Sequence, residues 1–161
     1  PMRPSALMAG QLAGLVLLGQ FQTFFYLVVG FAAGAHFEAG IGGIIVLSAL
    51  VSIISIGFGG LGLIMALRTG SGEAVQGMFP LMFVLLFFSS MTLPRNLIEQ
   101  DWFRHLATIN PISYLIEAIR SLFIFGWDPE ALALGFGVAI VLAVVSITFA
   151  AFSLKGRMLA S

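Results

Sequence analysis

The chain has 161 residues, of which 60% are hydrophobic and only 9% are charged, whereas a soluble domain carries about 25% charged residues. This composition excludes an ordinary soluble domain and indicates a protein whose apolar surface faces lipid. Seven basic and seven acidic residues give a formal net charge of zero, which removes the electrostatic case for nucleic-acid binding. The absence of cysteine excludes disulfides, thiolate metal sites and cysteine nucleophiles.

Four long stretches of the chain contain no Asp, Glu, Lys or Arg. A helix needs about 20 residues to cross a hydrocarbon layer of about 30 Å, and a charge at its centre costs about 2.5–3.5 kcal/mol. The sequence therefore predicts an all-α membrane protein with four transmembrane helices in one domain over residues 1–161. These helices are expected at about residues 11–33, 40–67, 77–93 and 131–153.

The first stretch has a competing interpretation as a signal peptide, because Arg3 precedes it and Ala33-Gly34-Ala35 resembles a cleavage site. Its apolar region is much longer than the usual 7–15 residues of a signal, so a transmembrane helix is favoured. Gln11 and Gln22 lie on one face of this helix, since eleven residues make about three turns. They are candidates for lining a translocation path, although hydrogen bonding between helices explains such residues equally well.

Glycine patterns in the first two predicted helices have two interpretations. Gly10/Gly14 and Gly30/Gly34 are G-x-x-x-G pairs, which permit close helix packing, but the chain has 19 glycines and such pairs also arise by abundance. The segment 57–62 fits G-x-G-x-x-G, yet no strand pattern precedes it and no acidic residue follows at the spacing that dinucleotide binding needs. This segment is therefore expected to serve helix packing or to be a flexible point.

A polar turn joins the second and third predicted spans and contains Arg68, Thr69, Gly70 and Glu73. With four spans, this turn and both termini lie on the same side of the membrane. That side carries four of the basic residues, and the other side carries three: Arg95, Arg104 and Arg120. Because basic residues favour the cytoplasmic side, both termini are predicted to be cytoplasmic. The four residues counted there are Arg3, Arg68, Lys155 and Arg157.

The segment 95–126, before the last span, is rich in both charged and apolar residues. Asn110-Pro111 predicts a helix start, with Asn as the N-cap and Pro at the first helical position. The helix from Pro111 to about residue 125 would be only about 22 Å long, and Glu117 and Arg120 are spaced to form an ion pair on it. We expect a short amphipathic helical hairpin that is re-entrant or lies in the outer interface. The alternative is a plain interfacial anchor with belt aromatics at Trp102, Tyr114 and Trp127.

Several motifs taken together resemble the membrane subunit of ABC exporters of the type-2 permease family, closest to its daunorubicin-resistance branch. They are Gly72-Glu73-Ala74-Val75-Gln76-Gly77, Phe88-Ser89-Ser90 with Leu93-Pro94, Asn110-Pro111-Ile112-Ser113-Tyr114, and Glu117-Ala118-Ile119-Arg120. The similarity runs from about Ala6 to the basic residues 155–157. Subunits of that family have six spans, so the resemblance implies that this chain is the C-terminal part of a permease; a genuine four-span protein is the alternative.

The resemblance implies a plasma or inner membrane subunit that moves a drug-like, lipid or glycan substrate out of the cytoplasm by alternating access. It also implies a separate ABC ATPase subunit that holds ATP and Mg²⁺, because this chain has no P-loop and is expected to bind no cofactor itself. A second permease copy, identical or different, would complete the machine. The resemblance places an outer gate helix at Asn110, Pro111, Tyr114, Glu117 and Arg120, and an ATPase contact at Arg68, Thr69, Gly70 and Glu73.

Two other functional classes remain open from the sequence. An ion-coupled secondary transporter usually places ionisable residues in mid-membrane, and the four predicted spans contain none of Asp, Glu, Lys or Arg. A non-transporting membrane assembly protein is the other class. Enzymatic activity is not expected, because His36 and His105 are solitary and no Ser-His-Asp or H-E-x-x-H arrangement is present. A metal site is not expected for the same reason.

Overall fold

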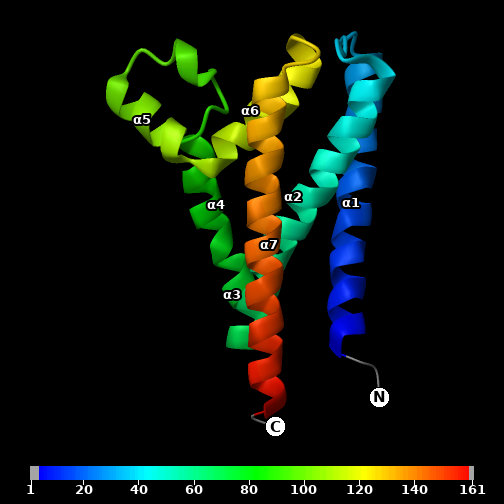
Figure 1. Ribbon diagram of the computed structural model, residues 1–161, viewed down its shortest axis with the longest axis vertical. Coiled ribbons are helices and arrows are strands. Elements are labelled where there is room, and N and C mark those ends of the chain that lie inside the picture. Colours follow the sequence, from blue (N-terminus) through cyan, green and yellow to red (C-terminus); the bar gives the residue numbers. More distant parts are fainter. Residues whose placement is uncertain (1–3, 160–161) are drawn as a thin grey trace.

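The computed structural model describes the backbone of residues 4–159 and the side chains of residues 6–73 and 75–154. Over this range the chain is helical and contains no strand (Figure 1), so the predicted all-helical class is confirmed. The helices in chain order are α1 (Pro4–Ala32), α2 (Gly40–Thr69), α3 (Gly72–Gln76), α4 (Met78–Phe87), the 3-10 helix η1 (Arg95–Leu97), α5 (Asp101–Ile109), α6 (Pro111–Ile124) and α7 (Pro129–Leu159).

Among the described residues, three helices are long and apolar enough to cross a membrane: α1, α2 and α7. They correspond to the first, second and fourth predicted spans. Gly70 ends α2 in the left-handed conformation, with φ +69°, and its N–H donates to the carbonyl of Ala66. A glycine takes this conformation without the steric cost that a Cβ would bring. Gly70 itself therefore determines where this span ends.

The predicted third span at 77–93 is not confirmed as a continuous helix. Its helical part, α4, has 10 residues and rises about 15 Å, which is too short to cross alone. The helix ends at Phe87, and the Ser89 hydroxyl then donates to the carbonyl of Leu86. Serine side chains that bond to nearby backbone groups compete with helix continuation, which explains why an apolar run produces a short helix here.

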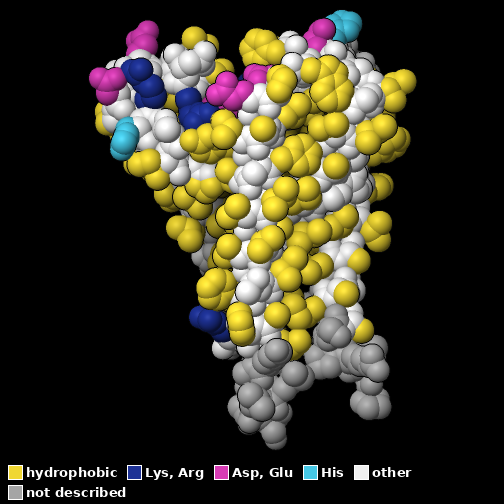
Figure 2. All heavy atoms as spheres, in the orientation of Figure 1, with side chains coloured by type: hydrophobic (Ala, Val, Ile, Leu, Met, Phe, Trp, Pro, Cys, Tyr) yellow, Lys and Arg dark blue, Asp and Glu magenta, His cyan; other side chains and the backbone are white. Residues whose placement is uncertain are grey.

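Both described ends of the chain lie at one end of the molecule, and α5 and α6 lie at the other (Figure 1). Charged side chains gather at the end that holds α5, and the band between the two ends is predominantly apolar (Figure 2). This distribution fits a molecule whose middle faces hydrocarbon. Arg3 and the side chains of Lys155 and Arg157, which entered the orientation prediction, lie outside the described residues.

Helix α2 packs against α1 on one side and α7 on the other through its glycine-rich segment. A Cβ on Gly60 would lie 2.5 Å from Ser146 Oγ and 2.8 Å from Ser146 Cβ of α7. A Cβ on Gly59 would lie 2.5 Å from Cδ1 of Leu15 on α1. The missing side chains allow both neighbours to approach the backbone closely. The helix-packing interpretation of the G-x-G-x-x-G segment is therefore confirmed.

The two G-x-x-x-G pairs do not mediate helix packing within the described chain. Nothing lies within 4 Å of a Cβ built on Gly10 or Gly14. Gly34 lies past the end of α1 with φ +86°, so Gly30 and Gly34 do not share a helix. Of the two interpretations, close helix packing through these pairs is therefore not supported among the described residues.

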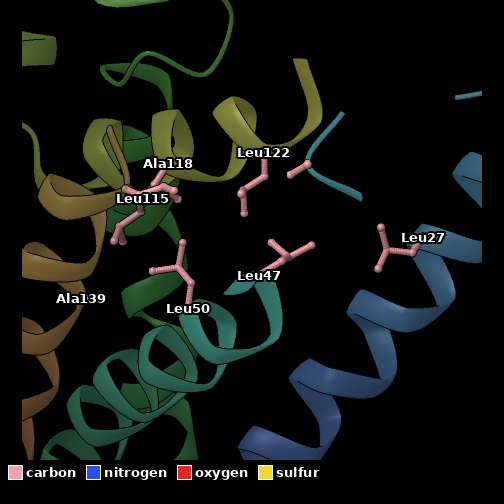
Figure 3. Close-up of a cluster of buried hydrophobic side chains, with 9 residues drawn as sticks. Leu27, Leu47, Leu50, Leu115, Ala118, Leu122 and Ala139 are labelled. Atoms are coloured by element: carbon pink, nitrogen blue, oxygen red, sulfur yellow. The ribbon is translucent and has the colours of Figure 1, made fainter. Parts of the chain in front are cut away.

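The apolar core lies where α2, α6 and α7 meet. Leu50 of α2 and Leu122 of α6 are fully buried, and Ala118 and Ala139 pack in the same cluster (Figure 3). The α1–α2 connection closes this end, because the N–H of Ala39 donates to the carbonyl of Leu122 at 3.1 Å. Helix α6 is therefore held by packing against α2 and α7 and by the α1–α2 connection.

Candidate functional site

Asn110 organises the start of α6 and the end of α4 at the same time. Its Oδ1 accepts a hydrogen bond from the N–H of Ile112 at 3.0 Å, with Pro111 in the first turn, so the predicted N-cap and helix start are confirmed. Its Nδ2 donates to the carbonyl of Leu85 on α4, and the residue is 6% exposed. One buried amide thus satisfies a free N–H of α6 and a free carbonyl of α4.

Replacing Asn110 should separate these two roles. Asn110→Ala removes the cap and the bond to Leu85, and we expect it to destabilise the protein by about 1–3 kcal/mol. Asn110→Ser keeps an oxygen able to cap α6 but cannot reach Leu85, so its stability should fall between those of Asn110→Ala and the wild type. Thermal unfolding of the purified protein in detergent measures the order. Equal stability of the alanine variant and the wild type would contradict the double role.

Ser90 and Ser113 connect the segment after α4 to the first turn of α6. The N–H of Ser90 donates to Ser113 Oγ at 3.0 Å, and Ser90 Oγ donates to the carbonyl of Ser113 at 3.2 Å. Both residues have no exposed surface. From the sequence, Ser113 was identified only as part of the motif that begins at Asn110, and this pairing was not predicted. The small polar exit Ser89-Ser90 was the available signal.

Arg120 extends the same attachment about two turns further along α6. Its Nη2 donates to the carbonyls of Ser90 and Met91, both at 2.8 Å. Arg120 Nη1 is buried and has no hydrogen-bond partner among the described residues. The guanidinium therefore holds backbone carbonyls of the segment that follows α4 and does not pair with Glu117.

Glu117 forms its ion pair with Arg95 of η1, so the predicted Glu117–Arg120 pair is wrong. Arg95 Nε lies 2.9 and 3.0 Å from the two carboxylate oxygens, and Nη2 lies 2.7 Å from Oε2. The Arg95 N–H adds a contact of 3.3 Å to Oε1. Both side chains are largely buried, at 21% and 18% exposure. The guanidinium contacts the carboxylate through two of its nitrogens, Nε and Nη2. This paired geometry is more favourable than the contact that Glu117 could make with Arg120, three residues along the same helix.

Burial raises the pKa of Glu117, but hydrogen bonds from the side chain and the N–H of Arg95, together with its positive charge, outweigh burial. The net pKa of Glu117 is therefore lower than usual, and the carboxylate stays ionised. Arg95 also lies over the ring of Tyr114, with Cζ 4.1 Å from the ring centroid. The Tyr114 hydroxyl donates to the carbonyl of Thr108 at 2.9 Å, which connects α6 to α5.

These contacts define a polar cluster, the α4–α6 junction, which joins the hairpin to the end of α4. Its members are Ser90, Arg95, Asn110, Ser113, Glu117 and Arg120. The junction can fix the position of α6 but offers no nucleophile paired with a base. No group of three or more His, Cys, Asp or Glu that could hold a metal ion occurs within the described part of the chain.

The predicted ATPase-contact residues lie at the α2–α3 turn. Arg68, Thr69, Gly70 and Glu73 are all exposed there. Thr69 Oγ1 donates to the carbonyl of Met65 at 2.7 Å, and Arg68 Nε donates to Ser153 Oγ of α7 at 3.4 Å. The turn lies toward the end of the molecule that holds both described chain ends, away from α5 and α6 (Figure 1). A partner can therefore reach this turn.

The predicted path residues Gln11 and Gln22 line a single groove between α1 and α2, here called the α1–α2 groove. Its volume is about 760 Å³, and its walls include Leu18, Gly59 and Leu63. The structure thus places both glutamines along one groove, while their role in translocation stays a prediction. Gln20 of the same helix points elsewhere, because its Nε2 donates to Ser48 O and Ser52 Oγ of α2.

A family model described as ABC-2 type transporter matches residues 1–124. The chain belongs to the ABC-2 type transporter family. No match was found among curated proteins, and none was found among solved structures.

As an ABC-2 type transporter, the chain is a multi-pass membrane protein and a translocation component that is not itself catalytic. The family implies pairing with an ABC ATPase subunit. The matched residues include the α1–α2 groove, the α2–α3 turn and the whole α4–α6 junction, whereas α7 lies beyond them. The family match therefore covers all three of these features.

Proposed function

We propose that this ABC-2 type transporter is the membrane subunit of an ATP-driven exporter of the daunorubicin-resistance-like branch, moving a drug-like, lipid or glycan substrate out of the cytoplasm. The family match over residues 1–124 carries the proposal. The substrate moves by alternating access, which requires one gate on each side of the membrane. Two permease copies, identical or different, act with two ATPase subunits that hold ATP and Mg²⁺.

In the proposed arrangement the protein lies in the cell membrane with both termini in the cytoplasm. Helices α3 and α4 together make the remaining crossing, since the chain then passes from one end of the molecule to the other four times (Figure 1). The α2–α3 turn faces the ATPase. The α4–α6 junction lies at the outer surface, where it holds α6 as part of the outer gate.

The two ends of the molecule are connected through α4. Its start follows α3, which contacts α2 beside the proposed ATPase contact. Its end is held to α6 by the Asn110 amide and the Ser90–Ser113 pair. A tilt of α4 when the ATPase subunits close would therefore move α6 directly. The α1–α2 groove, with Gln11 and Gln22, lines the proposed path.

Co-purification of the tagged full-length subunit with a P-loop ATPase, followed by ATP-driven transport in vesicles, tests the proposal. Glu73→Lys places a positive charge at the proposed contact, and we expect it to weaken ATPase association about tenfold. Glu99→Lys is the matched control, because Glu99 is also exposed but lies between η1 and α5, at the end of the molecule away from the α2–α3 turn (Figure 1). Equal association of both variants would refute the contact, and absence of any ATPase partner would refute the proposed function.

A further inference from the structure

The three glutamines of α1 have different hydrogen-bonding environments. Gln20 bonds to Ser48 and Ser52 of α2, while Gln11 and Gln22 make no hydrogen bond to any described residue. Both unpartnered amides line the α1–α2 groove. An amide in a membrane span is costly unless something hydrogen-bonds to it. Both side chains are exposed in this chain, so an occupant of the groove that supplies hydrogen-bonding groups is favoured over a pure hydrocarbon.

The groove is elongated along α1. Gln11 and Gln22 are separated by about 16 Å at 1.5 Å rise per residue, and the volume of about 760 Å³ lies in the usual range for small-molecule sites. Its apolar walls are mostly aliphatic, and Phe58 is the aromatic residue among those that line it. Such a groove fits a long aliphatic molecule better than a stack of aromatic rings.

No residue that lines the groove carries a formal charge. An ionised group of a ligand placed there would be desolvated without a counter-charge, which is strongly unfavourable. Glutamine side chains, in contrast, both donate and accept hydrogen bonds with neutral hydroxyl, ester or amide groups. The lining therefore selects against carboxylates, phosphates and ammonium groups.

We propose that the α1–α2 groove binds an elongated, uncharged and mainly aliphatic substrate with hydrogen-bonding groups near both ends, such as a neutral lipid. This inference rests on the proposed function, because it names the substrate class for the proposed path. Gln11 and Gln22 contact the polar groups of the substrate, and the aliphatic walls contact its chain. The site discriminates by charge and by length.

Gly14 gives a direct way to block the groove. It lines the groove, and a Cβ there meets nothing within 4 Å, so Gly14→Leu should fill the space while the helix stays intact. Gly10→Leu is a matched control one turn away, since Gly10 is equally open but does not line the groove. Tyr26→Phe controls for Gln11→Leu and Gln22→Leu, because Tyr26 is a 69% exposed polar residue of α1 outside the groove.

The test measures binding of a radiolabelled long-chain α,ω-diol to the full transporter with its ATPase, with the α,ω-dicarboxylic acid and the α,ω-diamine of equal chain length as competitors. We expect the neutral probe to bind, the charged competitors to displace it at least about tenfold less well, and Gly14→Leu to weaken binding at least about tenfold. Each glutamine variant should weaken binding about twofold to tenfold, as for the loss of one hydrogen bond. Gly10→Leu and Tyr26→Phe should bind as the wild type does.

Equal displacement by the charged competitors, or unchanged binding in Gly14→Leu, would overturn the inference. Loss of subunit assembly in Gly14→Leu but not in Gly10→Leu would show that another helix occupies the groove, which also overturns it. Binding without ATP-driven transport would refute the proposed function and leave the groove assignment standing. ATP-driven transport of other probes without binding of the diol would refute the groove assignment and leave the proposed function standing.

Discussion

Substitution of Gly135 by alanine is expected to destabilise the contact between α6 and α7. A Cβ at this position would overlap the methyl group of Ala118 and lie 3.0 Å from the carbonyl oxygen of Tyr114. Ala118 is fully buried and Tyr114 contributes backbone, so neither can move without shifting α6. Overpacking of this kind costs about 1–3 kcal/mol, which exceeds the gain of up to about 1 kcal/mol in helix propensity.

Gly137→Ala is the matched control, two residues along the same helix. A Cβ there meets nothing within 4 Å. Only the higher helix propensity of alanine then acts, so the stability of the variant should be unchanged or slightly higher. Thermal unfolding in detergent, monitored by tryptophan fluorescence, compares the two variants. If both shift the melting temperature in the same direction, the close approach of α6 to α7 is not as described.

Glu117→Gln should produce the second large effect, a loss of stability and of export with membrane insertion unchanged. The substitution keeps the shape of the side chain but leaves the guanidinium of Arg95, which is 21% exposed, without its counter-charge. Removing one member of a largely buried, hydrogen-bonded pair costs about 1–3 kcal/mol. If α6 is part of the outer gate, Glu117→Ala should likewise reduce ATP-driven export at normal expression.

Asp101→Asn provides a control within the same hairpin. Its pair with Arg104 is short, at 2.6 Å, but the side chains are 96% and 45% exposed, so solvent screens the attraction and little stability should be lost. Equal effects of the two substitutions would show that charge in the hairpin matters in general. Wild-type export by Glu117→Ala would argue against a gate role for α6.

The low pKa of Glu117 also predicts the direction of the pH dependence. Because folding lowers this pKa, the carboxylate stabilises the fold above its ordinary unfolded-state pKa of about 4.3. That contribution is lost as the pH falls below this value and through the lowered pKa of the folded state. The stability difference between wild type and Glu117→Gln should therefore shrink in acid, as measured by unfolding at pH 7 and below pH 4.

Local chemistry in the sequence was sufficient to predict α6. The dipeptide Asn110-Pro111 contains both the cap and the first helical residue, and the structure places both as expected. The three long spans were predictable for a similar reason, since charge-free length is a property of the chain alone. These features depend on near neighbours in sequence, so no knowledge of the tertiary fold was needed.

The partner of Glu117 could not be predicted in this way. Arg120 is three residues away and satisfies the helical spacing rule, whereas Arg95 is 22 residues away and becomes adjacent only when η1 folds against α6. The second hydrogen bond of Asn110 and the Ser90–Ser113 pair also depend on where α4 ends. A prediction from one sequence favours pairs of residues that are close in the sequence. The contacts of the α4–α6 junction mainly join residues that are far apart in the sequence.

The short length of α4 also affects the surrounding bilayer. Residues 72–87, which include α3 and α4, rise only about 24 Å, even if their axis runs parallel to the membrane normal. Phe79, Phe83 and Phe87 are more than half exposed on α4 and would contact acyl chains. If α3 and α4 make the proposed fourth crossing, a hydrocarbon layer of about 30 Å must thin locally to match it. Work stored in that deformation would make the tilt of α4 sensitive to the acyl-chain length of the host membrane.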